Sequence, residues 1–148
     1  MQIRYYEKNL PPEAKEIREE VFIKEQGFKN ELDEIDLIAT HIVLYDKEEA
    51  IATCRVFRHE EPDTYILGRL AVRKEYRHMK MGHAVVAAAE KYVTDKGAER
   101  LALHAQCSAS RFYQDNGFRE TGEADDDEGC PHIWMIKNLE TKQNGEWR

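Results

Sequence analysis

The segment that decides the fold is residues 67–85, LGRLAVRKEYRHMKMGHAV. It starts as a strand-like run, continues through a short basic turn, and places Gly82 directly before a long helical pattern. The first NH groups of a helix lack internal partners and lie at the positive end of the helix dipole, so they stabilise a phosphate that can approach closely. Gly82 permits that approach, and Arg77 and Lys80 add positive charge. The segment therefore predicts a phosphate-binding strand, turn and helix.

Other phosphate-binding motifs do not describe this segment. It contains no GK[ST] of a Walker loop, and its single glycine before the helix is not the GxGxxG of dinucleotide-binding sheets. If the segment is taken alone, the alternative interpretation is that Gly82 only makes a turn at the start of the helix.

Patterns on both sides of this segment predict alternating strands and helices. The strands are predicted at 2–7, 40–45, 50–58, 64–72, 101–105, 118–121 and 130–137, and the helices at about 12–25, from 81 to the stop at 96–97, and at 109–116. Ala14, Ile17 and Val21 share one face of the first helix. Residues 26–38 are predicted to be a loop with at most a short helical turn, and Gly68 inside its strand marks a bulge or a close backbone approach.

This element order predicts one domain. Strand, helix, three strands, helix, strand, helix and two strands make a three-layer α/β (α+β) domain over residues 1–148, with a mixed, mainly antiparallel sheet flanked by helices. The length of 148 residues is close to that of one ordinary domain.

Composition excludes several classes of protein. The net charge of −7 argues against a nucleic-acid partner, because phosphate contacts need clustered Lys and Arg. No stretch reaches the roughly 18 uncharged apolar residues of a membrane span. Charges at positions 4, 7 and 8 do not suit a secretory signal, so we expect a cytoplasmic location. Cys54, Cys107 and Cys130 form no CxxC pair, which predicts free thiols and no metal site.

Two motifs together resemble the signatures of the GNAT N-acetyltransferase superfamily. Arg77-x-x-Lys80-x-Gly82, preceded by the strand 69–72, resembles the family's Arg/Gln-x-x-Gly-x-Gly/Ala pyrophosphate loop, although Lys80 stands where the loop has its first glycine. Residues 109–118, ASRFYQDNGF, resemble the second signature, A-x-x-FY-x-x-x-GF. VFIKEQGF near the start and GCPHIWM near the end are similar to the ElaA-like branch.

The resemblance implies a GNAT-like fold with acetyl-CoA (coenzyme A) as the acyl donor. The acetyl group would pass directly, in a ternary complex, to an amine of a small molecule or peptide. Tyr113 would act as general acid toward the leaving thiolate, because a phenol of pKa about 10 suits a thiol. The backbone NH of Val72 would polarise the thioester carbonyl or bind the pantetheine arm. The implied cofactor-binding residues are Leu70, Ala71, Val72, Arg77, His78, Met79, Lys80, Met81, Gly82, His83, Ser108 and Phe112.

The general base remains open between several residues. An alkylamine of pKa about 10.4 is less than roughly 0.1% neutral at pH 7, so a group or a water chain must take its proton. His104 and His132 are candidates for the base, and each is also a candidate structural or substrate-orienting histidine. Glu25 is a comparable candidate, and a covalent intermediate on Cys107 is an alternative. A purely packing role is the alternative for Tyr113.

Two acidic runs bear on the acceptor. Residues 31–36 hold four carboxylates and residues 123–128 hold five, which favours a cationic amine, whereas a solvated surface is the alternative interpretation. Arg18-x-x-x-Phe22 followed by Glu31-x-Asp33-x-x-Asp36 also resembles the N-terminal signature of acyl-homoserine-lactone synthases.

A different class of function is a non-catalytic acyl-CoA sensor or partner domain. Lys80 in place of the loop glycine favours that class, and Tyr113 within its complete motif argues against it. A homodimer is left open. Neither a membrane nor a nucleic acid is expected as a partner.

Overall fold

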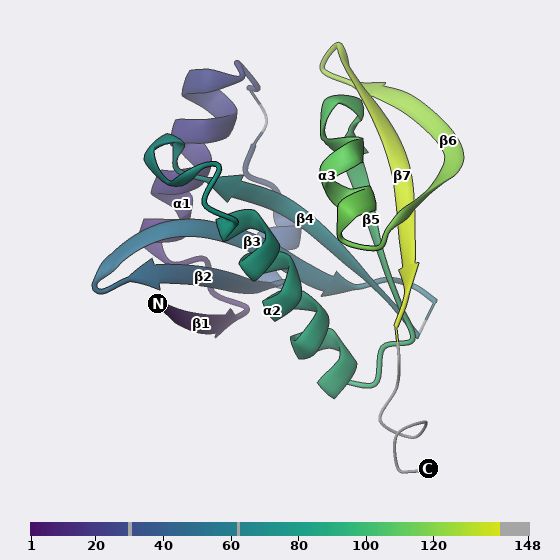
Figure 1. The fold of residues 1–148 in the computed structure, drawn as a ribbon, viewed down its shortest axis with the longest axis horizontal. Helices are drawn as coiled ribbons and strands as arrows, with labels where there is room; N and C mark the ends of the chain where they lie inside the picture. The colour runs from purple at the N-terminus through teal and green to yellow at the C-terminus, as the bar shows by residue number, and fades with distance from the viewer. Residues whose placement is uncertain (30, 62, 140–148) are drawn as a thin grey trace. The chain divides into compact units, whose positions relative to one another are not determined.

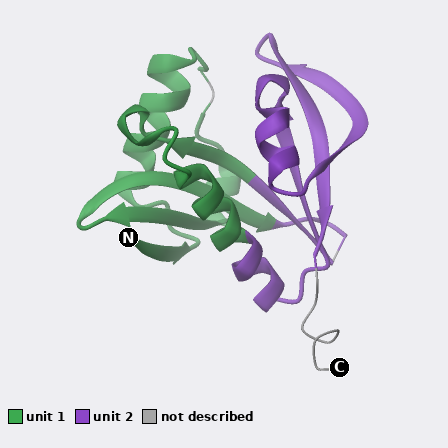
Figure 2. Cartoon of the chain, in the orientation of Figure 1, with its two compact units in different colours: residues 1–57, 68–89 green, residues 58–67, 90–148 purple. Residues whose placement is uncertain are grey.

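A computed structural model describes residues 1–29, 31–61 and 63–139. The chain forms two compact units, and Figure 2 distinguishes unit 1 (residues 1–57 and 68–89, green) from unit 2 (residues 58–67 and 90–148, purple). Two strands and one helix of the described residues contribute to both units. Each unit is described by itself.

The element order follows the sequence-based prediction (Figure 1). The strands are β1 (Gln2–Glu7), β2 (Thr40–Asp46), β3 (Glu49–Arg58), β4 (Thr64–Val72), β5 (Arg100–Gln106), β6 (Arg119–Asp127) and β7 (Cys130–Asn138). The α-helices are α1 (Pro12–Arg18), α2 (Met81–Asp95) and α3 (Ser110–Asp115). Shorter helical segments are the π-helix η1 (Glu19–Glu25) and the 3₁₀ turns η2 (Glu34–Leu37), η3 (Lys74–Tyr76) and η4 (Cys107–Ala109).

The strand order is β1-β2-β3-β4-β5-β7-β6. β4 and β5 pair in parallel, whereas the pairs β1–β2, β2–β3, β5–β7 and β6–β7 are antiparallel. The predicted mixed, mainly antiparallel sheet is therefore confirmed. A single three-layer domain over residues 1–148 stays a prediction.

Unit 1 is built on the apolar face of its first helix. Ala14, Ile17 and Val21 are at most 4% exposed, as their spacing predicts. They lie in one cluster with Val43, Tyr45, Ala50 and Ala71, and with the half-buried Tyr6, Leu10 and Phe22. The helix covers the predicted span 12–25, but it changes from α to π geometry after Arg18.

Unit 2 has a buried face and an acidic edge strand. Leu103 on β5 and Met135 on β7 lie opposite each other and are at most 2% exposed. The acidic run 123–128 lies between the predicted strands 118–121 and 130–137, but in the structure β6 continues through Asp127. Every residue of β6 is exposed. Charged side chains suit such an edge, because they keep its unpaired backbone groups from pairing with other chains.

A buried ion network holds the segment after η1 in unit 1. The Arg18 side chain is 1% exposed, and its two Nη atoms donate to the two carboxylate oxygens of Asp36 at 2.9 and 3.0 Å. Its Nε pairs with the Glu31 carboxylate, and Nη2 also donates to the Glu31 backbone oxygen at 3.2 Å. One arginine thus binds both ends of the acidic segment.

Two further arginines complete the network. Arg55 on β3 donates through Nη1 to Asp36 Oδ1 at 2.9 Å and to Asp33 Oδ1 at 2.6 Å. Arg69 on β4 donates through Nε to the Glu31 backbone oxygen at 2.9 Å and through Nη2 to Asp33 Oδ2 at 3.3 Å. Three cationic side chains therefore face three carboxylates.

This network corrects the expectation for the first acidic run. The carboxylates of Glu31, Asp33 and Asp36 are paired with arginines of the same unit, so their charge is not free to attract a cationic amine, and only Asp33 of the three is exposed. Arg18, whose motif resembles acyl-homoserine-lactone synthases, has a structural role here. Of the four acidic side chains, only Glu34 is outside the network.

We predict that Arg18→Ala lowers the free energy of unfolding by about 3–5 kcal/mol, because it leaves buried carboxylates without their cation. Urea denaturation measures this loss. Lys91→Ala, which removes an exposed pair with Asp95, is the control and should change stability by less than about 0.5 kcal/mol. A loss below about 1 kcal/mol for Arg18→Ala would show that water already reaches these carboxylates.

We also predict that part of the stability disappears in acid. Burial alone would raise the pKa of Asp36, but the hydrogen bonds and charges of Arg18 and Arg55 outweigh burial and lower that pKa from 3.8 to about 2. The stabilisation is complete above the unfolded value and is lost as the pH falls from about 4 to about 2. Urea midpoints at pH 6, 4 and 3 should decline more steeply in wild type than in Asp36→Asn. Parallel declines would contradict the assignment to Asp36.

Candidate active site

The predicted phosphate-binding turn lies in unit 1 between β4 and α2. His78, Met79 and Lys80 are exposed, α2 begins at Met81, and Gly82 occupies its first turn. The predicted strand, turn and helix are thus present. First-turn NH groups of a helix are the donors that an anion needs.

Lys80 has a backbone conformation that favours glycine. Its φ is 64°, and His78 is also left-handed at 65°. A left-handed non-glycine residue costs roughly 1–2 kcal/mol. Lys80 in the left-handed region followed by Met81 in a right-handed helix is the pairing found in anion-binding nests. The lysine therefore keeps the glycine-like backbone, and its exposed ammonium remains available for a phosphate.

Arg77 does not present a free charge to this turn. Its Nη1 and Nη2 donate to the two carboxylate oxygens of Glu25 at 2.9 and 2.6 Å, and its Nε donates to the Val72 backbone oxygen at 3.0 Å. The hydrogen bond from Arg77 lowers the pKa of Glu25 and, together with the charges of Arg77 and Lys74, outweighs the opposing effect of burial. Glu25 is accordingly a weaker base than an ordinary carboxylate, which disfavours it as the general base.

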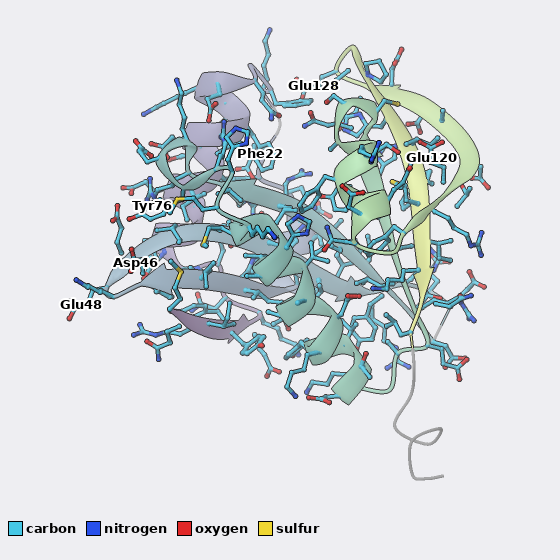
Figure 3. All side chains as sticks on the ribbon, viewed as in Figure 1. Phe22, Asp46, Glu48, Tyr76, Glu120 and Glu128 are labelled. Carbon is cyan, nitrogen blue, oxygen red and sulfur yellow. The ribbon has the colours of Figure 1, made fainter. Side chains whose placement is uncertain are left out.

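The turn is anchored to neighbouring elements of unit 1. The Tyr76 hydroxyl donates to Glu49 Oε1 at 3.0 Å and lies 3.5 Å from Asp46 Oδ2 at the β2–β3 turn; Figure 3 labels Tyr76 and Asp46 at this end of the sheet. Arg73 donates to Glu20 Oε2 on η1 at 2.8 Å. These contacts hold the turn between the first helix and the hairpin.

The end of β4 carries the predicted thioester contact. The irregularity that Gly68 predicts falls on the next residue, because Arg69 is left-handed with φ 52°. Arg73 N donates to Ile51 O on β3 at 2.9 Å. Because NH groups alternate along a strand, the NH of Val72 points away from β3. This direction leaves the Val72 NH unused by the β3–β4 ladder.

The second signature lies in unit 2 on η4 and α3. Ser108 is exposed and Phe112 is half-buried, whereas Tyr113 is only 9% exposed. The Tyr113 ring stands edge-on to Phe112, at 5.0 Å between ring centroids, and to Phe118, at 5.9 Å. The ring is packed, as the alternative interpretation holds, and a packed ring also has a defined position for its hydroxyl.

The two candidate histidines meet on one face of unit 2. His104 on β5 lies opposite Trp134 on β7, with ring centroids 4.8 Å apart, and its ring is 4.7 Å from that of His132. His104 Nε2 is 2.6 Å from Asp125 Oδ1 on β6, and His132 Nδ1 is 2.8 Å from the Cys130 backbone oxygen. Sequence reasoning missed Asp125 as an individual residue, because only strand register brings it here.

Among residues 1–29, 31–61 and 63–139, no three His, Cys, Asp or Glu side chains are arranged to hold a metal ion. No helix in the same ranges is long and apolar enough to cross a membrane. The three cysteines are free thiols, and Cys107, the alternative nucleophile, is exposed on η4.

Comparison with known proteins identifies relatives over most of the chain. A family model described as "Acetyltransferase (GNAT) domain" matches residues 7–139. The uncharacterized N-acetyltransferase YjcF of Bacillus subtilis is 37% identical over 126 residues, which cover 82% of this chain and 88% of YjcF. ElaA of Escherichia coli is 26% identical, with 84% of each chain covered.

Solved structures share the fold. The crystal structure of Escherichia coli ElaA superimposes with a TM-score of 0.81, covering 92% of this chain and 98% of ElaA at 24% identity. An aminoglycoside 6'-N-acetyltransferase complexed with coenzyme A superimposes with a TM-score of 0.75, covering 97% of this chain and 99% of the enzyme at 16% identity. The predicted resemblance, including the one to ElaA, is confirmed.

We predict opposite effects of Lys80→Gly on stability and on CoA binding. Glycine relieves the left-handed strain, so the thermal midpoint should rise by about 2–4 °C, while CoA affinity falls about threefold to tenfold because the ammonium is lost. Lys80→Ala is the matched control, since it removes the charge but keeps the strain. Differential scanning fluorimetry and titration calorimetry measure the two effects. Equal midpoints for the glycine and alanine variants would contradict the strain.

Proposed function

This chain belongs to the GNAT acetyltransferase family, and we propose that it transfers the acetyl group of acetyl-CoA directly to an amine of a small molecule or peptide. The observation that carries the proposal is the turn before α2, where a left-handed Lys80 leads into a helix N-terminus within the family's pyrophosphate motif. Membership alone does not fix an activity, but this turn supports binding of the donor.

The proposed donor contacts come mainly from the backbone. Because Glu25 neutralises Arg77, the pyrophosphate of CoA would be held by the NH groups of 78–83 and by the Lys80 ammonium. Leu70, Ala71 and Val72 would contact the pantetheine arm through the edge of β4, and Ser108 and Phe112 would complete the donor contacts. The aminoglycoside acetyltransferase with the same fold, which is complexed with coenzyme A, supports this role for the fold.

The proposed reaction needs no covalent enzyme intermediate. A neutral amine attacks the thioester carbon, the new C–N bond forms, and the C–S bond breaks. The Val72 NH stabilises the oxygen that becomes negative in the tetrahedral intermediate. The Tyr113 hydroxyl gives its proton to the leaving sulfur and regains a proton from the nitrogen of the intermediate, so the phenol is unchanged after one turnover.

The proposed acceptor is cationic before reaction. With residues 31–36 committed to arginines, the exposed carboxylates of β6, such as Glu123 and Asp127, are the acidic surface that favours a cation. The rival proposal, a non-catalytic acyl-CoA sensor, is favoured by one observation, the strained Lys80 in the donor loop.

We predict that Tyr113→Phe lowers acceptor-dependent CoA release at least about tenfold while CoA affinity stays within about twofold, because only the proton donor is removed. The assay follows CoA thiol release with polyamines, aminoglycosides, amino sugars and lysine peptides. Tyr92→Phe, which makes the same change beside Lys96 on α2, is the matched control and should retain wild-type turnover.

The outcomes separate the two proposals. Full activity of Tyr113→Phe would leave the transferase in place and remove the role of this hydroxyl. Tight CoA binding by wild type without release for any acceptor would favour the sensor, and failure to bind CoA would overturn both.

A further inference from the structure

We propose that His104 and Asp125 form a general-base dyad that deprotonates a cationic alkylamine acceptor, with His104 taking the proton and Asp125 acting as a positioning residue. The inference rests on the proposed acetyltransferase function. It assigns the base that the sequence leaves open, and it adds a carboxylate that no motif contains.

The hydrogen bond between the two side chains sets the tautomer of the imidazole. An ionised carboxylate can only accept a hydrogen bond, so at 2.6 Å from Asp125 Oδ1 the Nε2 atom of His104 carries the hydrogen. Nδ1 is then the ring atom with a lone pair. The dyad has the arrangement in which one ring nitrogen is held by a carboxylate and the other is the base.

Two aromatic rings fix the plane of the imidazole. Trp134 stacks on His104 at 4.8 Å with an interplanar angle of 24°, and His132 lies 4.7 Å away at 32°. Antiparallel register brings all three rings to one face of unit 2. His104 lies opposite Trp134, and residues 132 and 134 are two apart on β7, so their side chains point to the same side of the sheet. The imidazole is therefore oriented before any substrate binds.

Exposure distinguishes His104 from His132 as the base. The His104 side chain is 28% exposed and that of Asp125 is 56% exposed, so a proton taken from an amine can pass on to water. His132 is 6% exposed, and its Nδ1 donates to the Cys130 backbone oxygen. His132 supports the neighbouring ring, whereas His104 has both a carboxylate partner and access to solvent.

The charge of β6 suits an ammonium substrate. Asp125 lies opposite His132 in the register, and Asp127 follows it on the same face of the strand. These carboxylates raise the local concentration of an alkylammonium ion. When His104 takes the proton, the positive charge moves to the imidazole ring beside Asp125, where the carboxylate compensates it.

The proton balance of the step is closed. The alkylammonium gives one proton to His104 Nδ1, and His104 later releases it to water. The neutral amine forms the C–N bond as the C–S bond breaks. Of the two protons left on the substituted nitrogen, one replaces the proton that Tyr113 donates to sulfur and the other stays on the amide, so the products are the amide, CoA thiol and one free proton.

The test compares two acceptors of different basicity. For an alkylamine of pKa about 10, His104→Gln should lower kcat at least about thirtyfold, because the base is lost. For an alkoxyamine, whose nitrogen is mostly neutral at the assay pH, the loss should be below about threefold. The KM for acetyl-CoA should stay within about twofold for both acceptors. Equal losses with the two acceptors would overturn the base assignment.

A charge-matched pair of variants isolates Asp125. Asp125→Asn should lower kcat about tenfold or more with the alkylamine. Asp95→Asn removes the same charge from α2 in unit 2, where Asp95 pairs with the exposed Lys91, and it should leave kcat within about twofold. Equal losses of kcat in the two variants would show that Asp125 acts only through its negative charge, and this result would overturn the dyad.

Two controls keep the result interpretable. Thermal midpoints within a few degrees of wild type establish that the variants fold, and added imidazole should restore part of the alkylamine turnover in His104→Ala but not in Tyr113→Phe. No rescue of a folded His104→Ala would count against the base. Wild-type protein that releases no CoA for any acceptor would overturn the acetyltransferase itself, whereas active wild type with unaffected dyad variants would overturn this inference alone.

Discussion

The pairing of Arg18 with Glu31 and Asp36 is the constraint on which the rest of unit 1 depends. A guanidinium that is 1% exposed must be paired, so the chain after η1 has to return to Arg18 twice. Arg55 and Arg69 extend the same network to β3 and β4. Taking these charges from water is unfavourable, and such networks select a geometry more than they add stability. The geometry selected here includes the left-handed Arg69 just before the strand end that carries Val72.

A second ion pair determines which groups remain for the donor. Glu25 at the end of the π-helix takes both Nη atoms of Arg77, and Arg77 also holds the Val72 carbonyl. The motif arginine thus joins η1 to the turn and ceases to be a free phosphate ligand. The proposed donor contacts then come from backbone NH groups in the turn where Lys80 is left-handed. Arg77 thus occupies the arginine position of the motif, but its charge is used in a pair with Glu25.

The sequence predicted what depends on local pattern. The spacing of Ala14, Ile17 and Val21 identified a buried helix face, and the turn before Gly82 was recognised from residues that are adjacent in the chain. Features that depend on register or on partners far along the chain were missed. Nothing near Asp125 indicates that β6 continues through it, or that β7 brings it to His104. The left-handed φ of Lys80 was indicated only by the motif, in which lysine stands at the position of a glycine, because lysine itself gives no signal for that conformation.

The two acidic runs show why composition alone could not assign their roles. Residues 31–36 and 123–128 have similar carboxylate content and opposite environments. The first run lies within reach of three arginines, so its charge is cancelled inside unit 1. The second forms an exposed edge strand, where Asp125 pairs with His104. An arginine partner keeps its proton, whereas a histidine partner can gain or lose one, so a carboxylate paired with histidine can accompany a proton transfer. The partner of each acidic side chain, and not its charge, therefore decides which run can take part in chemistry.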